Sequence, residues 1–281
     1  MRLPFTKMHG IGNDYVYVNA FDVQVEDPAA LARKVSPRHT GIGSDGLILI
    51  HPSSKADARM EMYNADGSRG EMCGNGIRCV AKFVYDNGLA RRPSLTIETD
   101  AGLRTLDLEI EGDRVRRVTV DMGPPLLAPH DVPLLADRPM IDSPLEVDGR
   151  EYQATCISMG NPHCVLFVPS TVDAPVHTLG PRIETDARFP RRVNVEFAEV
   201  LGPLPANRLR MRVWERGSGE TAACGTGACA VTVAAVLTSR ASRRVVVELL
   251  GGELEIEWRE ADGHVLMTGA AEEVFRGEID I

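Results

Sequence analysis

The sequence predicts an α+β fold made of two pseudo-symmetric lobes, each a curved, mostly antiparallel, barrel-like sheet around one central helix. Short strand-like segments fill most of the chain, and one apolar helix-like run stands out in each half. Both runs open on the same kind of motif. Cys73-Gly-Asn-Gly follows Tyr63 by ten residues, and Cys224-Gly-Thr-Gly follows Trp214 by ten residues. This internal repeat predicts two similar lobes.

The repeat extends upstream of both cysteines. In the first half, Asn13 of Gly12-Asn13-Asp14-Tyr15 lies 60 residues before Cys73. In the second half, Asn161 of Gly160-Asn161-Pro162-His163 lies 63 residues before Cys224. A pseudo-twofold axis between the lobes would make the two thiols face each other across a cleft. We therefore expect the active site in that cleft, with chemistry that removes a proton from one face of a carbon and returns it to the other.

In the first lobe, alternating and short apolar runs predict strands. Ile77, Val80 and Val84 instead recur at helical spacing, and Asn87-Gly88 ends this helix. The predicted strands cover residues 15–18, 47–51, 59–63, 95–99, 104–110 and 115–122.

In the second lobe, an Ala/Val-rich helix over 228–238 follows the second cysteine. The stretch 121–148 is rich in proline and lacks periodicity, so we place the crossing between lobes near its start. The expected domains are residues 1–121, completed by 270–281, and residues 122–269. The predicted strands cover residues 154–159, 164–168, 193–200, 208–215, 244–250, 253–259 and 264–268.

Composition is typical of a globular cytoplasmic enzyme. The chain has 281 residues, 43% hydrophobic content and a net charge of −9. This charge argues against nucleic acid or an anionic membrane surface as a partner. There is no apolar run long enough to span a membrane and no secretory signal pattern. The six cysteines lack the spacing of a disulfide framework, which favours free thiols in a reducing compartment.

Cys73 and Cys224 carry the strongest chemical signal. A cysteine at a helix N-terminus lies in a positive potential that favours the thiolate. The Gly-X-Gly that follows leaves N–H groups able to bind a carboxylate. One such motif alone is explained by a turn beside a buried cysteine, but two matching motifs indicate a site. Cys79, Cys156, Cys164 and Cys229 are expected to pack in cores.

These motifs resemble the diaminopimelate epimerase family over nearly the whole chain. The resemblance implies interconversion of LL- and meso-diaminopimelate, on the route to lysine and peptidoglycan, with two cysteines as base and acid and without cofactor or metal. It also implies a homodimer. The matching blocks are residues 8–14, 41–46, 64–79, 160–163, 194–197 and 214–227.

By the same resemblance, Cys73 and Cys224 are the catalytic pair, and His163 and Glu215 tune the thiols. Arg216 offers a planar fork for a carboxylate, and Glu215 can accept from an ammonium group. Substrate contacts are expected from Asn13, Asn64, Asn161, Asn194, Glu215 and Arg216, with Gly74, Asn75, Gly225 and Thr226 as the carboxylate cradle.

Two positions depart from the family pattern. Many members carry Gln at the position of Gly46, so that side-chain contact is absent or replaced here. Many also carry Tyr at the position of Phe275, near the dimer interface of the family. The hydroxyl group is therefore missing from this part of the expected dimer.

Other classes of protein remain open at this stage. A related racemase acting on proline or hydroxyproline would use the same fold. A thiol sensor or metal-binding protein would explain two cysteines but not two carboxylate cradles. The Gly41–Gly46 segment matches G-x-G-x-x-G, but a strand is predicted after it, so it is a poor nucleotide-binding loop.

Overall fold

The computed structural model describes residues 2–70 and 72–280. The chain divides into two compact units, one of residues 1–121 with 268–281 and one of residues 122–267. Each unit combines one long run of paired strands with two helices, so the predicted α+β class is confirmed.

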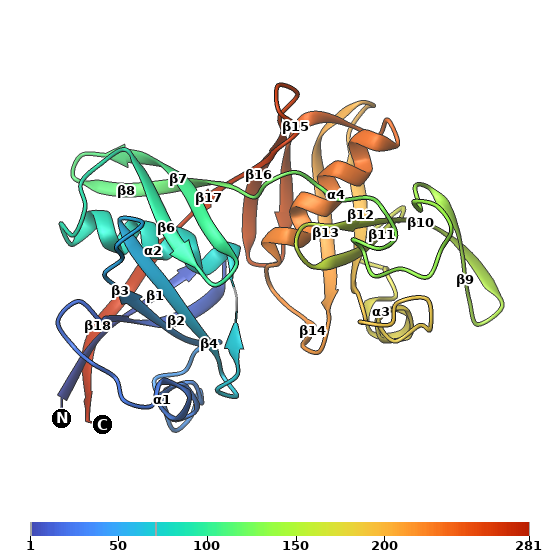
Figure 1. Cartoon of the computed structure of the whole chain (residues 1–281). Helices are drawn as coiled ribbons and strands as arrows, with labels where there is room; N and C mark the ends of the chain where they lie inside the picture. Colours follow the sequence, from blue (N-terminus) through green and yellow to red (C-terminus); the bar gives the residue numbers. More distant parts are fainter. Residues whose placement is uncertain (1, 71, 281) are drawn as a thin grey trace. The chain divides into compact units, whose positions relative to one another are not determined.

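Unit 1 is built on a ring of strands around helix α2 (Figure 1). The pairing runs from β18 through β1, β2, β3, β4, β6 and β7 to β8, and β8 pairs with β17, which leads directly into β18. Strand β17 begins in the last residues of unit 2 and enters unit 1 at residue 268. The elements are β1 (Arg2–Gly10), β2 (Asn13–Asn19), α1 (Pro28–Val35), β3 (Gly46–His51), β4 (Ala58–Asn64), β5 (Arg69–Gly70), α2 (Gly74–Asp86), β6 (Ser94–Thr99), β7 (Gly102–Glu111), β8 (Arg114–Asp121), β17 (Val265–Ala270) and β18 (Glu272–Asp280).

Unit 2 is a sheet in the order β9, β10, β11, β12, β13, β15, β16, and helix α4 packs against β10 to β13, β15 and β16 (Figure 1). The elements are β9 (Ser143–Val147), β10 (Arg150–Ser158), β11 (Pro162–Phe167), α3 (Val176–Glu184), β12 (Asn194–Leu201), β13 (Ala206–Glu215), β14 (Gly219–Glu220), α4 (Gly225–Leu237), β15 (Ala241–Leu249) and β16 (Gly252–Trp258).

The two units repeat the same strand pairings in the same order. In unit 1, β1–β2 is antiparallel, β2–β3 parallel, β3–β4 antiparallel, β4–β6 parallel and β6–β7 antiparallel. In unit 2, β10–β11, β11–β12, β12–β13, β13–β15 and β15–β16 follow the same series. The short strands β5 and β14 also pair with equivalent partners. The sequence repeat is therefore a repeat of topology.

Helices α1 and α3 were not predicted from the sequence. Each connects two parallel neighbours, β2 to β3 and β11 to β12, and parallel neighbours require a crossover. Helix α1 is only eight residues long and begins at Pro28. Asp27 is its N-cap, and the Asp27 side chain accepts a hydrogen bond from the Ala30 amide. Strands β1 and β18 were also missed, as was β9, which lies within the proline-rich stretch 121–148.

The two central helices begin where the sequence predicts. Cys73 and Cys224 are the N-cap residues of α2 and α4, in extended backbone conformation. Helix α4 contains no charged residue and is buried along most of its length, whereas α2 also buries Arg78 and Lys82. Within the described residues, no helix has the length and apolar character needed to cross a membrane.

Candidate active site

Cys73 lies at the start of α2, within hydrogen-bonding distance of one predicted site residue. Its Sγ accepts from the Gly76 amide at 3.3 Å and donates to the Asn13 Oδ1 at 3.2 Å. The thiol is partly exposed, while Gly74 and Asn75 of the next turn are buried. The first turn of α2 thus brings Cys73, Gly74, Asn75 and Asn13 together in unit 1.

Asp45 fixes the orientation of the Asn13 amide. The Asn13 Nδ2 donates to one Asp45 oxygen at 2.8 Å, so Oδ1 is the atom left facing the thiol. The same Asp45 oxygen accepts from the Asp14 amide at 3.0 Å, and Arg38 bridges the carboxylates of Asp14 and Asp45. The sequence did not single out Asp45, although it lies within the quoted block 41–46.

Tyr15 fills the space beside Gly46. A Cβ placed on Gly46 would lie 2.8 Å from Cε1 of Tyr15 and would clash with the Tyr63 carbonyl oxygen. Position 46 therefore has no room for a side chain in this backbone. The Tyr15 ring is 4% exposed, and burial raises the pKa of its hydroxyl well above the ordinary value of 10.0, with the neighbouring Cys73 as the next cause.

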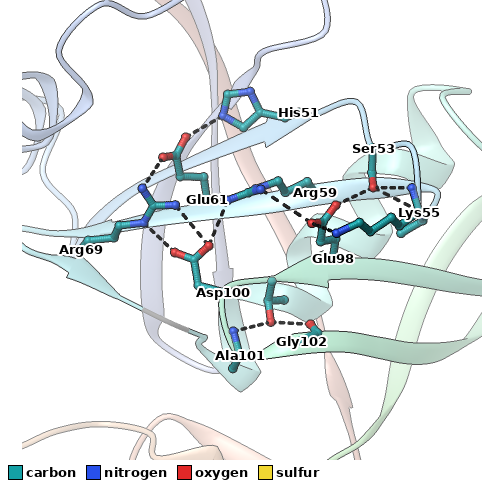
Figure 2. Close-up of polar contacts among 12 residues, drawn as sticks. His51, Ser53, Lys55, Arg59, Glu61, Arg69, Glu98, Asp100, Ala101 and Gly102 are labelled. Carbon is teal, nitrogen blue, oxygen red and sulfur yellow. Dashed lines mark hydrogen bonds and ion pairs between the residues drawn. The ribbon is translucent and has the colours of Figure 1, made fainter.

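A network of charged residues anchors the strand that precedes Cys73 (Figure 2). Arg69 of β5 donates to both oxygens of Asp100, at 2.5 and 3.1 Å, and also contacts Glu61 at 3.1 Å. Asp100 accepts from Arg59 as well, at 3.0 Å. Asn64, the last residue of β4, donates through its side-chain Nδ2 to the Ser68 hydroxyl at 2.9 Å, within the turn between β4 and β5.

Cys224 occupies the equivalent position in unit 2. Its Sγ accepts from the Gly227 amide at 3.4 Å and lies 3.5 Å from the Thr226 hydroxyl, and Gly225 is buried beside it. Burial raises the pKa of the Cys224 thiol well above 9.0, and the charges of Glu215 and Glu196 raise it further. Burial therefore opposes the thiolate form of Cys224, which the helix N-terminus favours.

A chain of polar side chains runs from Cys224 into the interior of unit 2. The Asn161 Nδ2 donates to the Thr226 Oγ1 at 3.2 Å, and the Asn161 Oδ1 lies 3.0 Å from Nε2 of His163. The other ring nitrogen, Nδ1, lies 2.6 Å from the Glu196 Oε1. Both His163 and Glu196 are fully buried. The sequence predicted Asn161, His163 and Thr226, but it did not single out Glu196, which lies within the quoted block 194–197.

The turn after β13 carries Glu215 and Arg216. The Arg216 amide donates to the Asn194 Oδ1 at 2.9 Å, and the Asn194 Nδ2 donates to the Pro162 carbonyl at 2.9 Å. Glu215 accepts a hydrogen bond from the Thr221 hydroxyl. The exposed Arg216 guanidinium donates to the Arg191 carbonyl at 3.0 Å. Asn194 therefore holds this turn beside Pro162, the first residue of β11, which follows Asn161 of the polar chain.

The repeat makes the residues of the two units equivalent in pairs. Tyr15 pairs with Gly46 across β2 and β3 as His163 pairs with Asn194 across β11 and β12. Two residues further along each second strand, Ile48 is therefore equivalent to Glu196. The backbone is repeated, but the side chains behind the two thiols differ in polarity.

Solved structures define the class of fold. The chain superimposes with a TM-score of 0.71 on a Bacillus anthracis phenazine biosynthesis protein of the PhzF family, at 17% identity and with both chains fully covered. A hydroxyproline epimerase from Agrobacterium vitis gives a TM-score of 0.70 at 15% identity, over 99% of this chain and 91% of that one. The chain thus has the two-unit α+β fold that these proteins share.

Sequence comparison identifies the family within that class. The diaminopimelate epimerase family matches residues 5–128 and 155–274. The diaminopimelate epimerase of Moorella thermoacetica is 54% identical over 279 residues, with 99% of each chain covered. That of Acetivibrio thermocellus is 52% identical over 278 residues, covering 99% of this chain and 98% of the relative. The chain belongs to the diaminopimelate epimerase family, a family of isomerases.

Proposed function

We propose that this protein interconverts LL- and meso-diaminopimelate by proton transfer at the α-carbon, without a cofactor or metal, in the synthesis of lysine and peptidoglycan precursors. One observation carries the proposal: a thiol caps the central helix at the same topological position in each unit. Family membership supports the substrate. In this proposal each unit contributes one thiol.

The two thiols exchange protonation states during one turnover. A thiolate removes the α-proton, the electron pair remains on the carbon, and the opposite thiol delivers its proton to the other face. Because the reaction is reversible, each thiol is the base in one direction and the acid in the other. The N–H groups at the helix starts would stabilise the carboxylate while negative charge develops next to it.

The remaining predicted site residues hold the substrate in this proposal. Arg216 reads the carboxylate of the amino-acid head that does not react, and Glu215 accepts from an ammonium group. His163 and Glu215 tune the thiols, with Glu215 acting on Cys224 through its charge. The other substrate contacts proposed are Asn13, Asn64, Gly74, Asn75, Asn161, Asn194, Gly225 and Thr226.

Hydrogen exchange tests this function directly. In deuterated water without added cofactor, the wild type should incorporate deuterium at the α-carbon of LL- and meso-diaminopimelate and interconvert them. Cys73→Ala and Cys224→Ala should each abolish interconversion. Cys156→Ala, which removes a core thiol, should leave the rate of interconversion unchanged. Full epimerase activity in either of the first two variants would reject the two-thiol mechanism. Faster turnover of hydroxyproline than of diaminopimelate would reject the substrate.

We also propose that the protein is a cytoplasmic homodimer. The expected interface includes β18, where Val274 is 55% exposed and Phe275 is 45% exposed. The Phe275 ring packs edge-on against Phe5 at 5.9 Å between centroids and presents apolar surface to a second copy. Light scattering should give twice the chain mass for the wild type and a smaller mass for Phe275→Asp. A wild-type monomer would reject the dimer.

A further inference from the structure

We infer that Glu196 is a positioning residue that holds His163 as a doubly protonated imidazolium, and that this charge directs a chain of hydrogen bonds toward Cys224. The charge state of His163 is independent of the substrate. Its effect on turnover rests on the proposed function.

Both ring nitrogens of His163 face hydrogen-bond acceptors. Nδ1 lies 2.6 Å from the Glu196 Oε1, and Nε2 lies 3.0 Å from the Asn161 Oδ1. A neutral imidazole donates through only one nitrogen, and only the imidazolium donates through both. The 2.6 Å contact with Glu196 is slightly shorter than the roughly 2.7–2.9 Å usual for a hydrogen bond from a charged N–H group to a carboxylate. The geometry therefore matches an imidazolium–carboxylate pair.

The surroundings of His163 favour this pairing. His163 and Glu196 are both fully buried, and Glu196 Oε2 has no hydrogen-bond partner among the described residues. A buried carboxylate in its ionised form is stabilised by a neighbouring positive charge. Helix α4 carries no charged side chain over this face, and its titratable groups are Cys229 and the capping Cys224. Glu215, from β13, and Glu196 itself both place negative charge near Cys224, and a proton on His163 offsets the charge of Glu196.

The other unit shows that the fold does not need a carboxylate at this position. Ile48 is the counterpart of Glu196 and is also fully buried. A Cβ on Gly76 would lie 2.8 Å from Ile48 Cδ1, just as a Cβ on Gly227 would lie 2.9 Å from Glu196 Oε1. An apolar residue therefore fits the same place beneath a helix start. Because a buried charge costs stability that an apolar residue does not, we assign Glu196 a role in the chemistry.

The charge on His163 sets the direction of every donor in the chain. With Nε2 protonated, Asn161 accepts through Oδ1 and donates through Nδ2 to the Thr226 Oγ1 at 3.2 Å. The hydroxyl proton of Thr226 is then available to the Cys224 Sγ at 3.5 Å, which favours the thiolate. With Nε2 deprotonated, the Asn161 amide would turn over, and Thr226 would donate to Asn161 instead. Glu196 thus prepares Cys224 to lose its proton.

Nitrogen NMR of the full-length protein, without substrate, tests the charge state. At pH 8, above the ordinary histidine pKa of about 6.5, both ring nitrogens of His163 should show imidazolium shifts in the wild type. Glu196→Gln should give the neutral pattern, and Glu196→Asp should keep the charged one. Asp86→Asn removes an equally buried carboxylate from unit 1 and should leave the His163 signals unchanged. A neutral His163 in the wild type would overturn the inference, whether or not Glu196→Gln folds.

Kinetics test the role in turnover. Glu196→Gln should lower kcat at least about tenfold while KM changes less than about threefold. Because Thr226→Val interrupts the same chain, the double variant should be slowed by less than the product of the two single effects. If the effects of the two substitutions on kcat multiply instead, Glu196 and Thr226 do not act through one chain of hydrogen bonds. The two proposals can fail separately. If His163 is charged and this charge depends on Glu196, but the protein does not turn over diaminopimelate, the proposed function is rejected and the charge assignment stands.

Discussion

The Glu184 carboxylate accepts a hydrogen bond from the Trp214 indole nitrogen at 2.7 Å. Its other oxygen accepts from the Gly217 amide at 2.9 Å. Glu184 therefore fixes both ends of the turn that carries Glu215 and Arg216. Since Glu184 is the last residue of α3, the helix that the sequence did not reveal positions two of the proposed substrate contacts.

Glu184→Ala should loosen this turn. The half-buried Trp214 indole N–H would lose its acceptor, at a cost of up to about 1–3 kcal/mol, whereas the amide of the exposed Gly217 can bond to water instead. We expect KM for diaminopimelate to rise about tenfold or more, together with a change in Trp214 fluorescence. Glu199→Ala is the matched control, because Glu199 accepts two bonds from Thr171 in another loop of unit 2. Equal KM values in the two variants would contradict the role of Glu184.

Arg216→Lys should weaken recognition of the distal carboxylate. Lysine keeps the charge but loses the fork that binds a carboxylate through two parallel hydrogen bonds. We expect kcat/KM to fall about ten- to hundredfold, as for loss of about 1.5–3 kcal/mol. The preference for diaminopimelate over lysine should fall as well. If the variant and the wild type discriminate equally against lysine, Arg216 does not read the distal head.

Glu215→Gln should make the Cys224 thiol more reactive. Burial raises the pKa of Cys224, and the negative charge of Glu215 raises it further. Removing that charge lowers the pKa, so the thiolate fraction at a given pH increases. Alkylation of Cys224 at pH 8, followed by peptide mass spectrometry, should be about three- to tenfold faster than in the wild type. Glu220→Gln, which removes the carboxylate paired with Arg212, should change this rate much less.

Asp100→Asn should destabilise the protein near neutral pH and lose its effect in acid. The hydrogen bond from Arg69 lowers the pKa of Asp100 below 3.8. Stability from this carboxylate is therefore present above pH 3.8 and is lost as the pH falls through the lower folded-state value. Because the network in Figure 2 is partly exposed, we expect a loss of roughly 0.5–1 kcal/mol at pH 7.

Thermal unfolding at pH 7 and at pH 3 measures this difference. Asp107→Asn is a suitable control, because Asp107 is an exposed carboxylate on β7. A deficit of the Asp100 variant that is equally large at both pH values would show that its charge is not the cause.

Mild oxidation should inactivate the enzyme reversibly through a Cys73–Cys224 disulfide. In the proposed mechanism, both sulfurs approach the same carbon. A thiol-specific oxidant such as diamide would take up the two electrons and two protons released when the bond forms. Peptide mapping should find the linked pair in inactive protein, and a thiol reductant should restore activity. Inactive protein in which both thiols remain free would contradict this proximity.

Much of the fold could be predicted because local patterns are strong where strands alternate. The starts of α2 and α4 follow from the repeated cysteine motif, and both helices cap on that cysteine. Helices α1 and α3 are short and gain stability mainly from packing on the sheet, so their sequences show little periodicity. Their existence follows from two parallel strand pairs, which are contacts between distant residues that a local pattern does not contain.

The predicted site residues were found through motifs, and the missed ones act through other side chains. Asp45 orients Asn13, and Glu196 contacts His163. Neither contact can be deduced from spacing, because each depends on register between strands and on which residues are buried. The burial of Cys224 could not be predicted either, because it depends on packing between residues that are distant in the sequence.

The return of β18 to β1 also constrains how the chain is made. Strand β1 holds the first described residues and β18 the last, and Arg2 lies opposite Asp280. During translation, the ring of unit 1 cannot close until the C-terminal segment has left the ribosome. Residues 122–267 form unit 2 without a break and can complete their sheet earlier. The N-terminal segment of unit 1 therefore remains without β18 until unit 2 has been synthesised, and a chain cut before residue 272 would contain a complete unit 2 and an open ring in unit 1.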